Sequence, residues 1–462
     1  MKQFDHIDLN LLRKYSRQGP RYTSYPPAPV FSSAFGPQTY LEEIDKTNRS
    51  DDAADLSLYF HHPFCDTLCY FCGCTMLVTR SRSQISEYNS YLEKEIDMIA
   101  PRIAKNRKVS QLHWGGGTPS YLTPEEIRHL GALTRARFNF AEDIEAGVEV
   151  DPRELTFDHM QAFREAGFNR ASMGVQDFDL QVQKAVNRVQ PESITRDAVK
   201  WCRELGFRSI NLDLIYGLPF QTLASFEKTV DIVLDISPDR IAVFNYAHVP
   251  WLKKHQKLLL EETMPSPELK LEIFKMTIEK LIAAGYWNIG MDHFAKYDDE
   301  MARAQREHTL YRNFQGYSTK AGCDLYGFGM SAIGQFNESY QQNVKTIGDY
   351  YKMIDAGTLA THAGYYMTPD DHIRKAVIMG LMCDLELDKT AIENKFNISF
   401  DNYFSDALVK IQEFMDDGLV SIGNSKITVH GLGRLVIRNI AMCFDAHIEK
   451  MMKEKPVFSK PV

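Results

Sequence analysis

The sequence predicts an α/β protein built around a closed or partly closed (β/α) barrel. From Leu56 to Phe294, short apolar runs rich in β-forming residues alternate with longer segments in which apolar residues recur at helical spacing. Repeated βα units indicate a parallel sheet, because parallel neighbours need a crossover connection. Since the repeat is long and its strands are apolar, a barrel is favoured over a doubly wound open sheet.

The expected elements follow one another regularly along this region. Crossover helices are expected within 86–105, 156–168 and 196–207, and a glycine follows the last turn of the second and third. The expected strands are "LSLYFHH" (56–62), "VSQLHWGGG" (109–117), "IEAGVEV" (144–150), "NRASMGVQ" (169–176), "RSINLDLIYG" (208–217), "RIAVFNYA" (240–247) and "YWNIGMDHF" (286–294).

Composition narrows the class of protein. The chain has 462 residues, eight cysteines and a formal net charge of −8. The length exceeds one ordinary core, and the cysteines are too few for a disulfide scaffold, which favours the reducing cytosol. No stretch has the apolar length of a signal peptide or a membrane span. We therefore expect a cytoplasmic protein with no membrane span and no nucleic-acid footprint.

Three regions are expected. Residues 1–50 form an N-terminal arm whose proline-rich run "RYTSYPPAP" (21–29) is a candidate lid or clasp, residues 51–362 form the barrel domain with a C-terminal extension, and residues 363–462 form a mostly helical domain. In the last of these, "IGNSKI" predicts a hairpin, so the domain resembles a winged helix. Acidic residues slightly outnumber basic ones there, which favours a packing or substrate-covering role over DNA reading.

Half of the cysteines lie in "FCDTLCYFCGC" (64–74). Cys65, Cys69 and Cys72 form CxxxCxxC directly after an expected strand, and Cys74 follows one residue later. Structural zinc usually takes its ligands as two short pairs, and the sequence has no second CxxC. An iron–sulfur cluster accepts several ligands from one loop, and three thiolates leave one iron open to a non-protein ligand. Plain buried cysteines would require this spacing to be accidental.

This motif and its setting resemble the radical SAM superfamily, and within it the oxygen-independent coproporphyrinogen III oxidase family. The resemblance rests on "YFHHPFCDTLCYFCGC", "PRYTSYP", "NRASMGVQDFDLQVQKAVNR", "IGMDHFA", "RNFQGYST" and "GRLVIRNIAMCFD", and so covers nearly the whole chain. It implies a partial barrel of the radical SAM type and one 4Fe–4S cluster held by Cys65, Cys69 and Cys72. Cys74 is then a spare thiol, and S-adenosyl-L-methionine, in two molecules by association with the family, completes the cofactors.

The resemblance also implies an activity. It is the conversion of two propionates of coproporphyrinogen III to vinyl groups, giving protoporphyrinogen IX in haem biosynthesis through a 5′-deoxyadenosyl radical. An electron donor such as flavodoxin or ferredoxin and an electron acceptor are the implied partners. The sequence carries no mark of the oligomeric state, and a monomer is the working expectation.

The cofactor-binding residues follow from the same motifs. The GGTP run after a strand brings backbone close to a ligand, although a plain strand-to-helix turn also explains its glycines. Glu149 at a strand end can accept hydrogen bonds from a ribose, whereas Asp151 reads as a structural N-cap. Arg188 could be a surface charge, and Asp213 is an acid inside an apolar strand. The residues that the resemblance assigns to the cofactor are Tyr59, Phe71, Gly116, Gly117, Thr118, Glu149, Gln176, Arg188, Asp213, Ala247 and Ile333.

Sequence alone leaves two alternative functions and the residues that bind the substrate carboxylates undecided. A related radical SAM haem chaperone or haem-utilisation enzyme is one alternative, and such a chaperone would resemble the middle of the chain but lack the extra cysteine and the long terminal regions. An iron–sulfur redox-sensing regulator with a winged helix would need a basic recognition helix. Four propionates require cations, for which Arg21, Arg312 and Lys320 are candidates.

Overall fold

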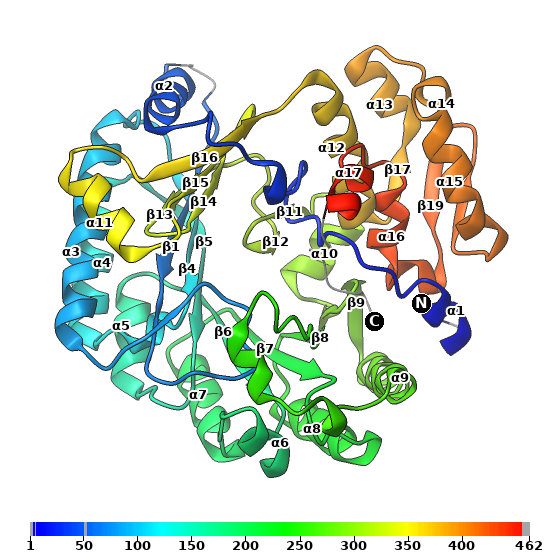
Figure 1. The fold of residues 1–462 in the computed structure, drawn as a ribbon, viewed down its shortest axis with the longest axis horizontal. Coiled ribbons are helices and arrows are strands. Elements are labelled where there is room, and N and C mark those ends of the chain that lie inside the picture. The colour runs from blue at the N-terminus through cyan, green and yellow to red at the C-terminus, as the bar shows by residue number, and fades with distance from the viewer. Residues whose placement is uncertain (1–2, 5, 50–52, 455–462) are drawn as a thin grey trace.

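A twelve-stranded sheet forms the centre of the computed structural model, which describes residues 3–454 apart from 5 and 50–52 (Figure 1). Every neighbouring pair from β13 through β8 is parallel, and the edge strands β16 and β9 do not meet. The barrel is therefore partial, as expected. The parallel strands are β13 (Asp324–Phe328), β1 (Leu56–His62), β4 (Val109–Gly116), β5 (Phe140–Val150), β6 (Arg170–Gln176), β7 (Ser209–Tyr216) and β8 (Arg240–Asn245).

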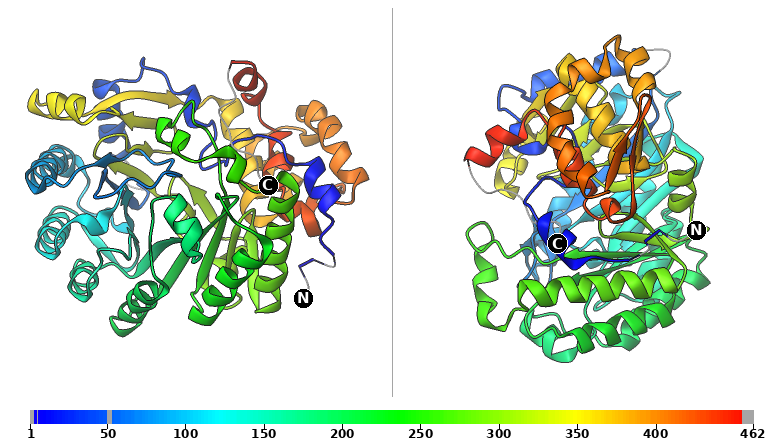
Figure 2. Two further views of the ribbon diagram at one scale, coloured as in Figure 1. Left: turned by 60° about the horizontal axis from the view of Figure 1, so that its bottom comes forward. Right: turned by 90° about the vertical axis from the view of Figure 1, so that its right-hand side faces the viewer.

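Helices cover the outer face of these strands (Figures 1 and 2). Local sequence explains their ends, since Thr123 and Glu126 form a capping box at the start of α4 and Gly167 takes a positive φ just after α5. The covering helices are α3 (Arg82–Ile99), α4 (Pro124–Arg137), α5 (Phe157–Glu165), α6 (Leu180–Ala185), α7 (Glu192–Glu204), α8 (Leu223–Ile236), α9 (Pro267–Ala283) and α11 (Ile347–Asp355).

Both edges of the sheet differ from the sequence expectation. The run 286–294, expected as one strand, folds as an antiparallel hairpin of β9 (Tyr286–Gly290) and β10 (His293–Lys296), with Met291 at a positive φ in its turn. β10 then adds antiparallel to β8. On the other side β14 (Ile333–Gln335), β15 (Ser339–Asn343) and β16 (Thr361–Tyr366) extend the sheet antiparallel from β13. The β10–β8 and β13–β1 pairings join segments far apart in the chain, whereas β9–β10 and β14–β15 are local hairpins of short strands.

The C-terminal region has the expected winged-helix arrangement. A three-stranded sheet in the order β17, β19, β18 packs with its helices, and the expected hairpin at 422–427 is present. Helix α10 (Glu300–Arg306) and the short hairpin of β11 (Tyr311–Asn313) and β12 (Gly316–Ser318) lie between β10 and β13 in the chain, and α10 and β11 contact α12 of the C-terminal region. Its elements are α12 (Pro369–Asp384), β17 (Glu386–Asp388), α13 (Lys389–Phe396), α14 (Phe400–Tyr403), α15 (Ser405–Asp416), β18 (Val420–Ile422), β19 (Lys426–Val429), α16 (Ile437–Met442) and α17 (Ile448–Glu454).

The N-terminal arm spans the gap between the two sheet edges. It begins with α1 (Leu9–Lys14), ends with α2 (Pro37–Thr47), and runs in blue between the barrel and the C-terminal helices in Figure 1. Its Tyr22 Oη donates to Asp445 at 2.9 Å, and the carbonyl of Tyr25 accepts from Tyr340 Oη at 2.9 Å. The expected boundary between residues 50 and 51 lies outside the described residues.

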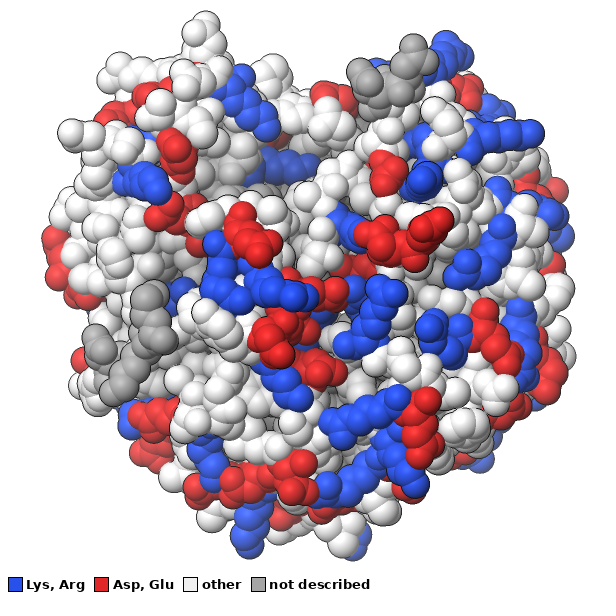
Figure 3. Space-filling model, turned by 180° about the vertical axis from the view of Figure 1, so that it is seen from behind, with Lys and Arg blue, Asp and Glu red and all other residues white. Residues whose placement is uncertain are grey.

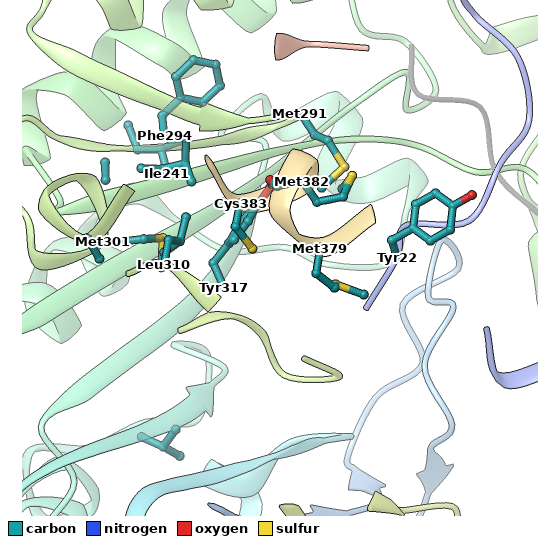
Figure 4. Packing of buried hydrophobic residues seen from close by; sticks show 14 of the residues in the cluster. Tyr22, Ile241, Met291, Phe294, Met301, Leu310, Tyr317, Met379, Met382 and Cys383 are labelled. Carbon is teal, nitrogen blue, oxygen red and sulfur yellow. Dashed lines mark hydrogen bonds between the residues drawn. The ribbon is translucent and has the colours of Figure 1, made fainter. Parts of the chain in front are cut away.

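One continuous hydrophobic core joins all three regions. Figure 4 shows it passing from Phe294 of the barrel through Met291 and Met382 toward Tyr22 of the arm. No helix in the described part of the chain is both long enough and apolar enough to cross a membrane.

Candidate active site

The cysteine loop leaves the carboxyl end of β1. β2 (Phe64–Cys65) pairs with β3 (Leu77–Val78) and closes a loop that contains Cys69, Cys72 and Cys74. Active sites of parallel (β/α) folds lie at this end of the strands, where the loops of several βα units meet. The loop therefore stands at the mouth of the barrel.

Polar groups surround the three motif thiols. Thr118 Oγ1 lies 3.2 Å from Cys65 Sγ, and Arg188 Nη1 lies 3.6 Å from Cys69 Sγ. A hydrogen bond from the Cys74 side chain lowers the pKa of Cys72 to about 6. This hydrogen bond favours the thiolate form of Cys72, the form that binds metals, whereas burial raises the pKa of the Cys65 thiol to about 12.

The donor set fits an iron–sulfur cluster better than a single ion. Among the described residues, no three His, Cys, Asp or Glu side chains are arranged around one metal ion. Three soft thiols presented by one loop are the ligands that iron–sulfur clusters take, and a cluster holds its ligands farther apart than one ion does. The residues present therefore fit the group that the sequence motif implies.

A cavity runs along the inside of the barrel. Burial alternates along β6 and β7, where the partly accessible residues are the ones that face inward. Among the residues that line it are Glu149, Ser172, Asn211 and Asp213. Although protein surrounds Glu149, its side chain is 48% accessible because it faces this hollow.

Two inward carboxyl groups have different electrostatics. Burial alone would raise the pKa of Glu149, but hydrogen bonds from His113 and from the Gly116 N–H hold that pKa below its ordinary value. Burial raises the pKa of Asp213 to about 7, even though Asn211 Nδ2 donates to it at 2.8 Å. Glu149 is thus a fixed anion, while Asp213 can donate as well as accept near neutral pH.

The glycines of "GGTP" are packed against the base of the cysteine loop. Gly116 has a φ of +115°, and its N–H donates to Glu149 Oε2 at 3.1 Å. A Cβ on Gly117 would lie 2.6 Å from the backbone of Pro63. Close packing alone therefore requires a glycine at position 117, whether or not a ligand approaches this turn.

Arg188 is not a surface charge: it is 7% accessible, and its Nη1 is paired with Asp151 Oδ2 at 2.8 Å. The reading of Asp151 as an N-cap was wrong, since α5 starts at Phe157 with Thr156 as its cap. Asp151 pairs with both Arg153 and Arg188, and these guanidinium groups face the cysteine loop.

Gln176, the last residue of β6, also points to a site. It has a φ of 68°, and its buried Oε1 has no hydrogen-bond partner among the described residues. A residue held in the left-handed region next to an unsatisfied oxygen is typical of a functional position.

The other assigned residues divide between two places. Tyr59 and Ile333 line a second cavity, which also contacts Glu149 and Cys74. Phe71 packs instead in a small apolar cluster beside the cysteine loop. Ala247 follows β8 and is half-buried, next to the buried Tyr246.

Sequence reasoning missed two histidines. His61 Nδ1 lies 3.0 Å from Tyr59 Oη, and its Nε2 lies 2.9 Å from the carbonyl of Thr75, so it ties β1 to the far end of the cysteine loop. His113 stacks on Tyr59 and contacts Glu149. Alternation along β1 places Tyr59 and His61 on one face, but the register with β4 is not readable from sequence.

The three residues proposed to bind substrate carboxylates do not lie at one place in the structure. Arg21 Nη2 lies 2.8 Å from both carboxylate oxygens of Asp292, and the buried Arg312 donates to the Arg21 carbonyl. Lys320 pairs with Asp143 at 2.8 Å near the amino ends of the strands, at the opposite end of the barrel from the cysteine loop. Arg21 and Arg312 therefore remain candidates for binding substrate carboxylates, and the position of Lys320 removes it from the set.

Comparisons with known proteins agree with this geometry. The radical SAM superfamily model matches residues 59–233, and the HemN C-terminal domain model matches residues 367–436. The oxygen-independent coproporphyrinogen III oxidase of Escherichia coli K12 is 47% identical over 96% of each chain, and that of Pseudomonas aeruginosa is 44% identical over 97% of each. This chain belongs to the oxygen-independent coproporphyrinogen III oxidase family.

A solved structure supports the membership. Coproporphyrinogen III oxidase (HemN) from E. coli, described as a radical SAM enzyme, superposes with a TM-score of 0.91 at 46% identity and covers 96% of this chain and all of that one. The match includes both terminal regions, which the haem-chaperone alternative would lack. The oxidase family thus accounts for the arm and the winged-helix domain as well as the barrel.

Proposed function

We propose that this chain converts two propionates of coproporphyrinogen III to vinyl groups without oxygen, giving protoporphyrinogen IX in haem biosynthesis. The observation that carries the proposal is its likeness over nearly the full length to coproporphyrinogen III oxidases, together with three thiols on one loop at the barrel mouth. When bound, the cluster and S-adenosylmethionine supply the radical that removes a hydrogen atom from the substrate. The chain supplies binding, orientation and exclusion of water.

Cys65, Cys69 and Cys72 are the proposed cluster ligands. Thr118 fixes the Cys65 thiol, and Arg188 and Arg153 face Cys69. These contacts orient the thiols before a metal binds, because second-shell hydrogen bonds fix the direction of a ligand.

The assigned polar residues are proposed to bind S-adenosylmethionine. Glu149 is ionised and accessible from both cavities, so it can accept hydrogen bonds from a ribose diol. Gln176 offers an unpartnered carbonyl, and Asp213 a carboxyl group that can act as donor. Two adjoining cavities that share His113, Glu149 and Gln315 support binding of two cofactor molecules.

An anaerobic turnover assay tests the function. Reconstituted protein is supplied with S-adenosylmethionine, a reductant and coproporphyrinogen III, and the porphyrin products are separated after oxidation. Vinyl products together with methionine are expected. Methionine release without a vinyl product would refute the proposed substrate and leave the radical SAM fold intact.

A further inference from the structure

The outer side of the cysteine loop is covered by residues 249–260, "VPWLKKHQKLLL", which follow β8 and are called here the cover segment. Gln256 Nε2 donates to the Phe71 carbonyl at 3.0 Å, His255 Nε2 lies 2.7 Å from the Cys72 carbonyl, and Lys253 Nζ donates to the Cys74 carbonyl at 2.8 Å. The cover segment is therefore one hydrogen-bonded layer away from the backbone that carries Cys72.

The buried side of the cover segment is held by packing and hydrogen bonds. Leu259 packs with Val182 and Val186 in an apolar cluster separate from the main core, and the cysteine-loop residues Tyr70 and Phe71 pack against that cluster. The Gln256 side chain also accepts from the Val249 N–H at 2.6 Å. These contacts hold the segment in one position relative to the loop.

Its outward face is strongly apolar. Trp251, Leu252, Leu258 and Leu260 are 59%, 57%, 57% and 56% accessible. Single exposed apolar residues are common, but four within ten positions of one anchored segment are typical of an interaction surface. In Figure 2 the green segment after β8 projects beyond the strands, where a partner can reach it.

The cover segment itself is basic, and the exposed Glu261 and Glu262 follow it directly. Its sequence has three lysines and no acidic residue, although acidic residues outnumber basic ones in the whole chain. Lys254 and Lys257 are exposed, and neither has an ion pair within the described part of the chain. On the face drawn in Figure 3, by contrast, the two signs of charge are interspersed.

We propose that the cover segment docks a small acidic protein that carries one electron. This inference rests on the proposed function, which requires a reductant for the iron–sulfur site. An apolar centre with unpaired lysines is complementary to an acidic partner, and such charges raise the rate of encounter in the weak complexes formed by electron carriers. The carrier loses one electron, the iron–sulfur site gains it, and no bond forms or breaks.

Charge reversal with a flavodoxin as the probe tests the proposal. The variant Lys254→Glu/Lys257→Glu and the apolar variant Leu258→Ser/Leu260→Ser are compared with Lys105→Glu/Lys108→Glu, which changes two exposed lysines before β4 at the opposite end of the barrel. All are used as holoproteins. The Kd for flavodoxin is measured at two salt concentrations, and cluster reduction by reduced flavodoxin or by dithionite is followed by stopped-flow absorption.

Both cover-segment variants should bind flavodoxin at least about tenfold more weakly and be reduced by it correspondingly more slowly, with dithionite reduction unchanged. The control should match the parent protein. Unchanged affinity in both cover-segment variants would overturn the proposal. Normal carrier binding with weakened coproporphyrinogen binding would also overturn it, by showing the segment to be a substrate lid. Since no readout of carrier docking involves coproporphyrinogen, failure of the proposed substrate would be seen separately.

Discussion

Glu149 is the residue whose proposed role is most directly testable. Glu149→Ala removes an ionised acceptor from the barrel cavity, so affinity for S-adenosylmethionine should fall about tenfold to a hundredfold, the usual effect of losing a hydrogen bond to a charged group. Iron content and visible absorption should stay unchanged. Equilibrium dialysis with labelled cofactor measures the affinity. Asp143→Asn, which removes a charge at the other end of the barrel, serves as control. Equal affinity in Glu149→Ala and the parent would take Glu149 out of the binding site.

The cysteines give a second prediction at this scale. Cys72→Ser should lose the reconstituted cluster, whereas Cys74→Ser should keep it, because a cluster with four protein thiolates has no iron left for S-adenosylmethionine. The Cys74 N–H donates to Cys72 Sγ at 3.4 Å, which makes Cys74 a neighbour of a ligand. Anaerobic iron and sulfide analysis of the two proteins decides between the roles. Loss of the cluster from Cys74→Ser would show that Cys74 is itself a ligand.

The functional residues themselves were easier to predict from sequence than the residues that they contact. CxxxCxxC and the inward Glu149 are visible in the chain because each is marked by a local pattern. The burial of Arg188, the Asp151 pair and the contacts of His113 depend on residues up to 119 positions away. Periodicity within one segment carries no information about such pairings.

At the scale of elements, the arm is part of the fold. A separable lid would have few buried side chains, yet Tyr15, Tyr22 and Tyr25 are all buried in the common core. Tyr22→Ala should lower the free energy of unfolding by about 3 kcal/mol or more, as for other large buried aromatic residues. Tyr22→Phe, which removes only the Asp445 hydrogen bond, should cost about 1–2 kcal/mol. Denaturant unfolding measures both, and equal small losses would indicate a loosely held arm.

The elements that sequence predicted best are the strands of the βα repeat. β1 was expected at its observed bounds, and β6 and β7 within one residue at each end, because apolar runs bounded by turns are local signals. The β9–β10 hairpin and strands β13 to β16 were not predicted. β10 and β13 pair with β8 and β1, which are distant in sequence, and the short runs of the hairpin strands resemble ordinary loops in sequence.

At the scale of the whole molecule, one buried acid should make stability depend on pH. Burial raises the pKa of Glu95 to about 7 where it accepts hydrogen bonds from the Gly329 N–H, Tyr350 and Asn343. The folded state then holds a proton that the unfolded state releases near pH 4.5, so stability falls as pH rises from about 4.5 to about 7. The full effect is up to about 3 kcal/mol.

Glu95→Gln isolates this effect. The difference in free energy of unfolding between the variant and the parent should change across this pH range and level off above it. Using the difference removes the contributions of other acids, including Asp213. Parallel pH profiles for the two proteins would show that Glu95 does not titrate in the folded state.

The clasp between the arm and the C-terminal region has a consequence for biogenesis. The backbone carbonyl of Tyr15 and the Tyr25 hydroxyl bind Asn439 and Ala446, which lie 424 and 421 residues farther along the chain. At ribosomal speeds, residues 15–25 wait on the order of a minute before these partners are synthesised. The cysteine loop at residues 64–74 is also made long before Asn439 and Ala446. The order of synthesis thus leaves the arm without its C-terminal partners until nearly the whole chain has been made.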